Sequence, residues 1–182
     1  LYEDSLRELD SMQQFGDDQK EIKKKIDSLT KQLRNYAEEL SRERHKISKN
    51  LDHAVVEELR QLGMNKALFE TRIVSSSLNE NNYACTEKGI DKVEFLLSVN
   101  PGQELRSLSK VASGGELSRI MLALKTVLIS MDSVEILIFD EVDSGISGGI
   151  AEIVGKKLLK LGERHQALCV THLPQIAAFA EH

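Results

Sequence analysis

The stretch that most constrains the fold is a short apolar run that ends on two acidic residues. Residues 136–139 read Ile-Leu-Ile-Phe, with Val134 just upstream, and Asp140 and Glu141 follow at once. Such a run is typical of a strand buried on both faces, as in a parallel sheet covered by helices on each side. In an open α/β sheet the ligand crevice lies at the carboxyl ends of the strands. Taken alone, the acidic pair fits a solvated strand end slightly better than a site, so its neighbours decide.

A second short strand also ends on polar residues. Residues 167–170 are followed by Thr171 and His172, before Pro174 opens another helix. A helix from about 148 to 161 is expected to connect the two strands. Because successive strands tend to be neighbours in a sheet, His172 is expected to face the same crevice as the acidic pair.

Two glycines open the helix that precedes the acidic strand. Ser113 and Glu116 have the Ser-x-x-Glu spacing of a capping box, which is a complete structural explanation for both. Capping does not explain Gly114 and Gly115, which weaken a first turn but leave bare N–H groups at the positive end of the helix dipole. A phosphate can bind at such a helix end, and the sequence supports this interpretation and a purely structural one about equally.

One similarity to a phosphate-binding loop is rejected. Residues 150–157 include Gly155-Lys156, but the first glycine of the loop pattern is missing and Lys157 replaces the required Ser or Thr. The segment also lies within a predicted helix. The sequence therefore contains no phosphate loop.

The first third of the chain has a coiled-coil pattern. Between residues 22 and 62 apolar residues alternate steps of four and three, with Glu43 as a polar interruption. A helix from about 18 to 62 would be roughly 65 Å long, and Gly16 is expected to break the helical pattern before it. So narrow an apolar stripe needs a partner, either a second copy in a parallel coil or another arm of the same polypeptide.

Two half-exposed strands are expected after the long helix. Apolar and polar residues alternate over 69–73 and 93–97, and the polar loop 79–89 separates them. We expect these strands to form an antiparallel edge that roots the long helix in the globular part. The predicted organisation is a coiled-coil arm over 1–62, with a helix break near 16, and a globular part over 63–182.

The composition indicates a folded protein. Apolar residues make up 41% of the chain, and a net charge of −5 argues against a constitutively basic nucleic-acid surface. Cys85 and Cys169 match neither a disulfide framework nor a metal-ligand spacing, which favours a reducing, cytoplasmic setting. No apolar run could cross a bilayer and no signal sequence is visible, so no membrane association is expected. Since the chain opens inside a helical pattern, we expect a fragment.

Three motifs together resemble the C-terminal half of an ABC-type ATPase head of the SMC-like class. They are KVASGGELSR at 110–119, FDEVDSGISG at 139–148 and THLPQIA at 171–177. Within that class they are most similar to the RecN family of bacterial DNA repair proteins. The resemblance is specific from residue 107 onward and is one of pattern in the coil. It implies an α/β fold, namely the C-terminal lobe of a P-loop ATPase head, with a mostly parallel sheet and flanking helices, plus a long coiled-coil helix.

The resemblance also implies a role for each motif residue. Asp140 corresponds to the Walker B aspartate that holds Mg²⁺, and Glu141 to the general base that activates the attacking water. His172 corresponds to the switch histidine that senses the γ-phosphate. The residues expected to bind ATP across a dimer interface are those of the signature motif and the D-loop: Ser113, Gly114, Gly115, Glu116 and Asp143.

The implied function is ATP hydrolysis in the recombinational repair of DNA double-strand breaks, with ATP and Mg²⁺ bound between two joined heads. Expected partners are the missing N-terminal half of the same protein, a second head and DNA, in a cytoplasmic, nucleoid-associated setting. The isolated fragment is predicted to be inactive, because it lacks the phosphate loop. Two alternatives remain: another SMC-like chromosome-organising ATPase, and an ABC transporter subunit, against which the long coil argues.

Overall fold

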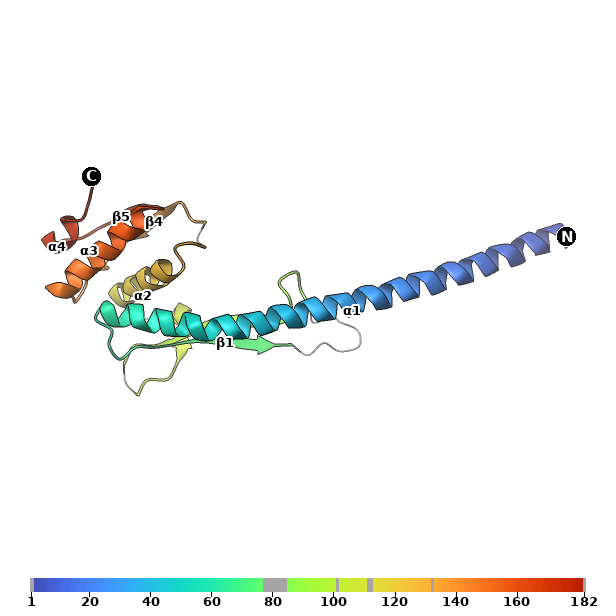
Figure 1. The fold of residues 1–182 in the computed structure, drawn as a ribbon, viewed down its shortest axis with the longest axis horizontal. Helices are drawn as coiled ribbons and strands as arrows, with labels where there is room; N and C mark the ends of the chain where they lie inside the picture. The colour runs from blue at the N-terminus through green and yellow to red at the C-terminus, as the bar shows by residue number, and fades with distance from the viewer. Residues whose placement is uncertain (1, 77–84, 101, 111–112, 132, 182) are drawn as a thin grey trace. The chain divides into compact units, whose positions relative to one another are not determined.

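The chain folds into helices and strands in the order that the sequence predicts (Figure 1). The computed structural model describes residues 2–76, 85–100, 102–110, 113–131 and 133–181. Most of the expected loop 79–89, and Val111 and Ala112 of the first motif, lie outside these ranges. The elements before the first motif are α1 (Tyr2–Gln61), β1 (Leu68–Ser75), β2 (Asp91–Ser98), β3 (Arg106–Ser107) and the 3-10 helix η1 (Leu108–Lys110). Those that follow are α2 (Gly114–Val127), β4 (Ile136–Phe139), α3 (Gly149–Gly162), β5 (Gln166–Cys169) and α4 (Pro174–Ala177).

The chain forms two compact units. The first comprises Leu1–His45 and Val74–Lys92, and the second comprises Lys46–Ile73 and Val93–His182. The residues expected to carry chemistry all belong to the second unit.

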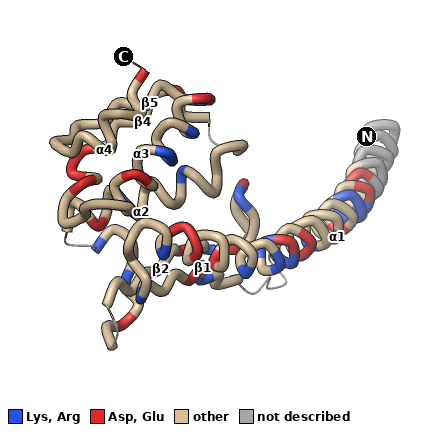
Figure 2. The backbone as a smooth tube through the Cα atoms, turned by 60° about the vertical axis from the view of Figure 1, so that its left-hand side comes forward, with Lys and Arg blue, Asp and Glu red and all other residues tan. Residues whose placement is uncertain are grey.

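Helix α1 runs without interruption through Gly16, where the sequence predicted a break. A glycine inside a helix costs only about 0.5–1 kcal/mol relative to alanine, so the turns on either side carry the helix across it. Nothing lies within 4 Å of the position that a Cβ of Gly16 would occupy. Figure 2 shows residues of both charge signs along α1, as expected of a solvated helix surface.

In the first unit the apolar seam of α1 is exposed. A different stripe of the helix, including Ala37 and Ser41, is buried instead. The seam therefore has no cover among the described residues of this unit, as a coiled-coil helix without its partner would show. The exposed seam residues of this unit are Ile22, Ile26, Leu29, Leu33, Tyr36 and Leu40.

A buried carboxylate joins the two segments of the first unit. Oδ1 of Asp91 accepts hydrogen bonds from Oγ of Ser41 at 2.8 Å and of Ser75 at 2.7 Å. Oδ2 accepts a hydrogen bond from Arg44 at 3.1 Å. Burial acts to raise the pKa of Asp91, but these hydrogen bonds and the charge of Arg44 outweigh it, so the pKa is lowered.

In the second unit the same seam is buried from Val55 onward, whereas Ile47 is still exposed. Val55, Leu59 and Leu62 are fully buried in a core shared with residues of α2, α3 and β4. Asp52 ties the helix to β1, because its Oδ1 accepts hydrogen bonds from the N–H and the hydroxyl of Thr71 at 2.8 and 2.6 Å. The sequence correctly predicted that β1 and β2 root the long helix.

The strands β1, β2 and β3 form a sheet of their own, in that order. β2 and β3 are antiparallel, with Leu96 opposite Ser107, and the rings of Phe69 and Phe95 lie 5.5 Å apart. The predicted strands at 69–73 and 93–97 are therefore confirmed. β2 lies between β1 and β3, so these strands form a sheet separate from the parallel pair.

The predicted parallel pair consists of β4 and β5. Leu137 and Phe139 of β4 are buried, but Ile136 is 52% exposed and Ile138 is 72% exposed. The prediction that this strand is buried on both faces is thus wrong for the described residues, because its core contacts all lie on one face. The α/β class with flanking helices is confirmed. In the described part of the chain, no helix combines the length and the apolar character that a membrane span requires.

Candidate functional site

The carboxyl ends of β4 and β5 meet at one edge of the parallel pair. The register pairs Phe139 with Cys169. Asp140 and Glu141 follow the first strand, and His172 lies three residues beyond the second. This is the edge at which an open α/β sheet binds ligands. The placement of His172 at the same sheet edge as the acidic pair agrees with the sequence prediction.

The N-terminus of α2 reaches the same edge. Ser113 is the N-cap of α2, and its Oγ accepts a hydrogen bond from the N–H of Glu116 at 3.4 Å. One turn further on, the hydroxyl of Ser118 donates to the carbonyl oxygen of Asp140 at 2.5 Å. The start of the signature helix is therefore fastened to the end of the acidic strand.

Both glycines of the signature motif lie against the loop that follows β4. A Cβ on Gly114 would overlap Oε2 of Glu141, and a Cβ on Gly115 would lie 2.6 Å from Cβ of Ser144 and 3.0 Å from the carbonyl oxygen of Glu141. The glycines are thus needed for a close approach within the chain. This structural reason was not visible in the sequence.

Glu141 has an unusual backbone conformation. Its φ is 56°, in the left-handed region that residues other than glycine rarely adopt. Its N–H donates to Oδ1 of Asp140 at 2.8 Å, and its carbonyl oxygen accepts from the N–H of Ser144 at 3.0 Å. Such local strain persists where the surrounding structure holds it, and it is common at functional sites.

Asp140 offers one exposed carboxylate at this edge. The described residues contain no group of three or more His, Cys, Asp and Glu side chains that could hold a metal ion. Mg²⁺ commonly keeps several waters and binds through one or two carboxylates together with phosphate oxygens of the substrate. The donor set therefore suits a Mg²⁺ ion that arrives with a nucleotide and does not suit a metal held by protein ligands alone.

Asp143 is buried, and residues that follow β5 surround its carboxylate. Oδ2 accepts hydrogen bonds from the hydroxyl of Thr171 at 2.5 Å and from the N–H of His172 at 2.9 Å. Nδ1 of His172 lies 3.0 Å from the same oxygen. Burial acts to raise the pKa of Asp143, but these contacts outweigh it, so the pKa is lowered.

Two further residues take part in the site although the sequence analysis gave them no role. Arg119 of α2 is buried, and its NH1 donates to the carbonyl oxygen of Ser144 at 2.6 Å and approaches that of Val142 at 3.5 Å. Thr171 holds Asp143. Neither role could be predicted, because hydrogen bonds between segments distant in the sequence cannot be recognised from the spacing of neighbouring residues.

The negative charges at this edge affect the pKa of the Cys169 thiol. Burial raises the pKa of its thiol, and the negative charges of Asp143 and Asp140 raise it further. The thiol therefore stays protonated and unreactive at neutral pH.

The rejected phosphate-loop pattern proves to be structural. Lys157 lies in α3 and is buried, and its Nζ pairs with Glu58 and donates to Oε1 of Gln61 at 2.8 Å. A Cβ on Gly155 would overlap the ring of Phe179. The ion pair and the hydrogen bond explain Lys157, and the close contact with Phe179 explains Gly155.

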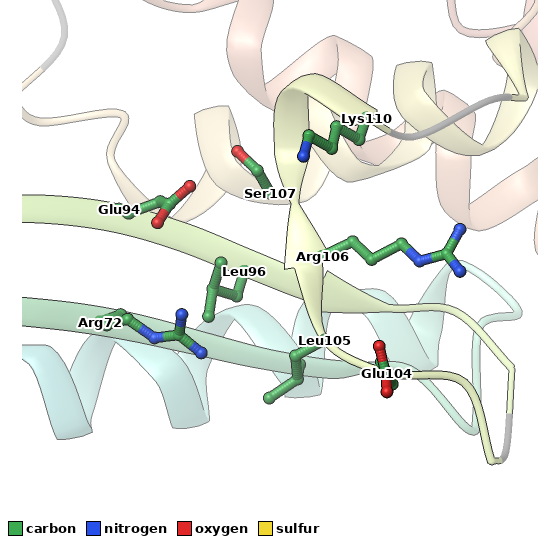
Figure 3. A pocket seen from close by; sticks show the side chains of 8 residues that line it. All are labelled: Arg72, Glu94, Leu96, Glu104, Leu105, Arg106, Ser107 and Lys110. Atoms are coloured by element: carbon green, nitrogen blue, oxygen red, sulfur yellow. The ribbon is translucent and has the colours of Figure 1, made fainter.

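A separate hollow of about 460 Å³ lies on the three-stranded sheet (Figure 3). It is lined by three basic and two acidic side chains, so its charge does not favour a ligand of either sign. None of the expected site residues lines it. Its lining residues are Arg72, Glu94, Leu96, Glu104, Leu105, Arg106, Ser107 and Lys110.

Known proteins with similar sequences carry the name that the motifs suggested. The chain is 41% identical to DNA repair protein RecN of Bacillus subtilis (strain 168), over 96% of this chain and 32% of that protein. It is 45% identical to DNA repair protein RecN of Vibrio cholerae, over 80% of this chain and 26% of that protein. No family model matches the chain.

Solved structures of SMC heads show a more distant likeness. The Smc head domain of Pyrococcus furiosus, solved with an extended coiled coil, is 15% identical with a TM-score of 0.48, over 72% of this chain and 30% of that one. The SMC head domain of Thermotoga maritima is 19% identical with a TM-score of 0.35, over 80% of this chain and 45% of that one. The assignment depends on the sequence relatives instead. The chain spans about a third of the length of those relatives, and over nearly its whole length it is RecN-like in sequence, as the three motifs indicated.

Proposed function

We propose that the chain is part of a RecN-type, SMC-like ATPase that acts in the recombinational repair of DNA double-strand breaks. One observation carries the proposal. The parallel register of β4 and β5 brings Asp140, Glu141 and His172 to one edge, and the hydrogen bond from Ser118 to Asp140 adds the N-terminus of α2. An acidic pair, a histidine and a helix N-terminus are among the groups that nucleotide hydrolysis uses.

The helix end serves a second head in this proposal. Ser113, Gly114 and Gly115 offer their N–H groups to the γ-phosphate of ATP bound by the opposite subunit, while Glu116 completes the first turn of α2. ATP thereby joins two heads, and its hydrolysis releases them.

The strand ends serve the nucleotide of the chain's own head. Asp140 would hold Mg²⁺, which neutralises charge on the phosphates when bound. Glu141 accepts a proton from the attacking water, and His172 contacts the γ-phosphate. Asp143 belongs to the loop that approaches the dimer interface.

The proposal requires a phosphate loop from elsewhere, since this sequence contains none. The RecN relatives are about three times as long as the chain, which supports a second segment that carries the loop. In that arrangement residues 1–62 form one arm of a coiled coil, and 63–182 form one lobe of a head. The exposed seam of α1 and the exposed face of β4, with Ile136 and Ile138, support a missing partner for each part. The ATPase would act on DNA in the cytoplasm, at the nucleoid.

A substitution of Glu141 in the intact protein tests the proposal. Glu141→Gln keeps the side-chain shape but removes the base, so ATP should still bind while turnover falls by roughly 10² to 10⁴. Glu152→Gln is the matched control, because Glu152 is an exposed residue of α3 that pairs with the exposed Lys156. A near-normal ATPase rate in Glu141→Gln would place the base elsewhere and refute the assignment.

The chain alone is proposed to be inactive. Ser113 to Gly115 and Asp140 contact only the γ-phosphate end of a nucleotide, and nothing in the sequence wraps the α- and β-phosphates. Calorimetry with Mg²⁺ and ATP should therefore show no tight binding to the 182-residue chain. Tight binding would reveal a nucleotide site of another kind.

A further inference from the structure

The carboxylate of Asp143 is buried and already bound within the chain. Its side chain is only 6% exposed, and one oxygen takes three contacts from Thr171 and His172. A D-loop residue that contacts a second subunit would need a free polar face. In this structure the carboxylate is instead occupied by the segment that carries the switch histidine.

The contact with Asp143 determines which ring nitrogen of His172 carries a proton. A carboxylate can only accept hydrogen bonds, so the contact between Nδ1 and Asp143 places a proton on Nδ1. The His172 side chain itself is 78% exposed. The hydroxyl of Thr171 donates to Asp143 and accepts from the N–H of Leu173 at 3.1 Å. Asp143, held by Thr171, thus determines both which ring nitrogen carries the proton and the direction of the ring.

Arg119 of α2 contacts the same loop at the residues that flank Asp143. Arg119 holds the carbonyl oxygen of Ser144 on one side of Asp143 and approaches that of Val142 on the other. Arg119 belongs to α2, whose N-terminus is the signature motif. Residues 142–144 therefore lie between the signature helix and the histidine, in contact with both.

We propose that Asp143 is a positioning residue that fixes the proton and the direction of the His172 ring, and that Arg119 links this arrangement to the signature helix. The proposal rests on the proposed function, since it assigns a task to His172 within that ATPase. A displacement of α2 when its N-terminus engages a phosphate would move the carbonyl groups beside Asp143. The state of the helix end is thereby transmitted to the histidine of the same chain.

The direct test is ¹⁵N NMR of the histidine rings in the 182-residue chain at about pH 8, where an ordinary histidine is neutral. The chain has five histidines, and His172→Gln identifies the signals of this ring. We expect the wild-type ring to carry its proton on Nδ1, and Asp143→Ala to revert it to the Nε2-protonated form that free histidine favours. A wild-type His172 ring protonated on Nε2 overturns the proposal, whether or not Asp143→Ala folds.

Two variants test the link to the signature helix. Arg119→Lys keeps the charge but loses the fork of donors, so His172 should show a mixture of both protonated forms. Arg60→Lys is the matched control, because Arg60 makes an exposed contact with Glu57 on α1. An unchanged His172 spectrum in a folded Arg119→Lys chain, judged by circular dichroism, overturns the link. If Arg119→Lys does not fold, Arg119→Gln replaces it, with the same expected and contrary results.

An activity measurement separates the two proposals. In the intact ATPase, Asp143→Ala should lower kcat by about 10-fold to 100-fold, as loss of a group that orients an active-site residue does, with ATP affinity unchanged. A loss of ATP affinity with unchanged kcat would make Asp143 a nucleotide contact and overturn the proposal. If the intact protein has no ATPase activity, the proposed function fails, whereas the NMR result still decides the role of Asp143.

Discussion

The contact between α2 and the loop after β4 makes a sharp prediction for glycine-to-alanine substitutions. Three glycines in helices of this chain have different surroundings. A Cβ at Gly115 would lie 2.6 Å from Cβ of Ser144, one at Gly114 would meet only the end of the Glu141 side chain, and one at Gly16 would meet nothing within 4 Å. The same chemical change should therefore have three different results.

The magnitude for Gly115→Ala follows from that distance. Carbon atoms attract best at about 3.5–4.0 Å, so the added methyl group overlaps Ser144 by roughly 1 Å. Overpacking of this kind costs about 1–3 kcal/mol, and the better helix propensity of alanine offsets about 0.5–1 kcal/mol. The middles of these two ranges give a net loss of about 1.3 kcal/mol, which should lower the Tm by about 2–5 °C for a chain of this size.

The other two substitutions serve as references in the same thermal melts. Gly16→Ala should raise the helicity and leave the Tm of the second unit unchanged. Gly114→Ala should also keep the Tm, because the Glu141 side chain can move aside, but in the intact ATPase it should lower turnover by displacing the base. A Gly115→Ala chain that melts with the wild type would refute the close approach of the loop to α2.

Three further predictions follow from charged groups and from the arm. The folded pKa values of Asp91 and Asp143 are lowered, so the contribution of these groups to stability is complete above the unfolded pKa of about 3.9 and is lost as the pH falls through the folded values. Thermal melts from pH 7 to pH 3 should therefore show a loss of stability below about pH 4 that is smaller in Asp91→Asn, and a flat profile would contradict this. Lys157→Met should lower the free energy of unfolding, measured by chemical denaturation, by about 2–4 kcal/mol, since it leaves Glu58 unpaired at a partly buried position. Lys156→Met on the exposed face should change it little, and equal effects of the two substitutions would refute the argument. Coexpression with the upstream arm of the intact protein should raise helicity and Tm, and a tight parallel dimer of the chain alone, with an unchanged melt, would count against that pairing.

Much of the site could be predicted because it follows from local pattern. The apolar runs before Asp140 and Thr171 predicted two parallel strands, and parallel strands bring their carboxyl ends together. Ser113 could be recognised as an N-cap from its spacing to Glu116. Each of these inferences needs only residues that are close in sequence.

The inferences that failed depend on contacts between distant segments. Ile138 is as apolar as Leu137, so the sequence could not tell that its face of β4 has no cover among the described residues. Gly16 is a weak helix former, but the loss at one residue is smaller than the gain from the turns around it. The roles of Arg119 and Thr171 depend on hydrogen bonds between segments that are distant in the sequence, which no periodicity encodes.

The central claim is that the signature motif of one chain and the acidic pair of another form one catalytic site. The most direct measurement is ATP hydrolysis by a mixture of two variants of the intact protein, Ser113→Arg and Glu141→Gln, each inactive alone. In a mixed dimer one of the two sites combines an intact signature motif with an intact base, so random mixing should restore about a quarter of the wild-type rate. A mixture as inactive as either variant alone would contradict the claim, because it would place both groups in the site of a single chain.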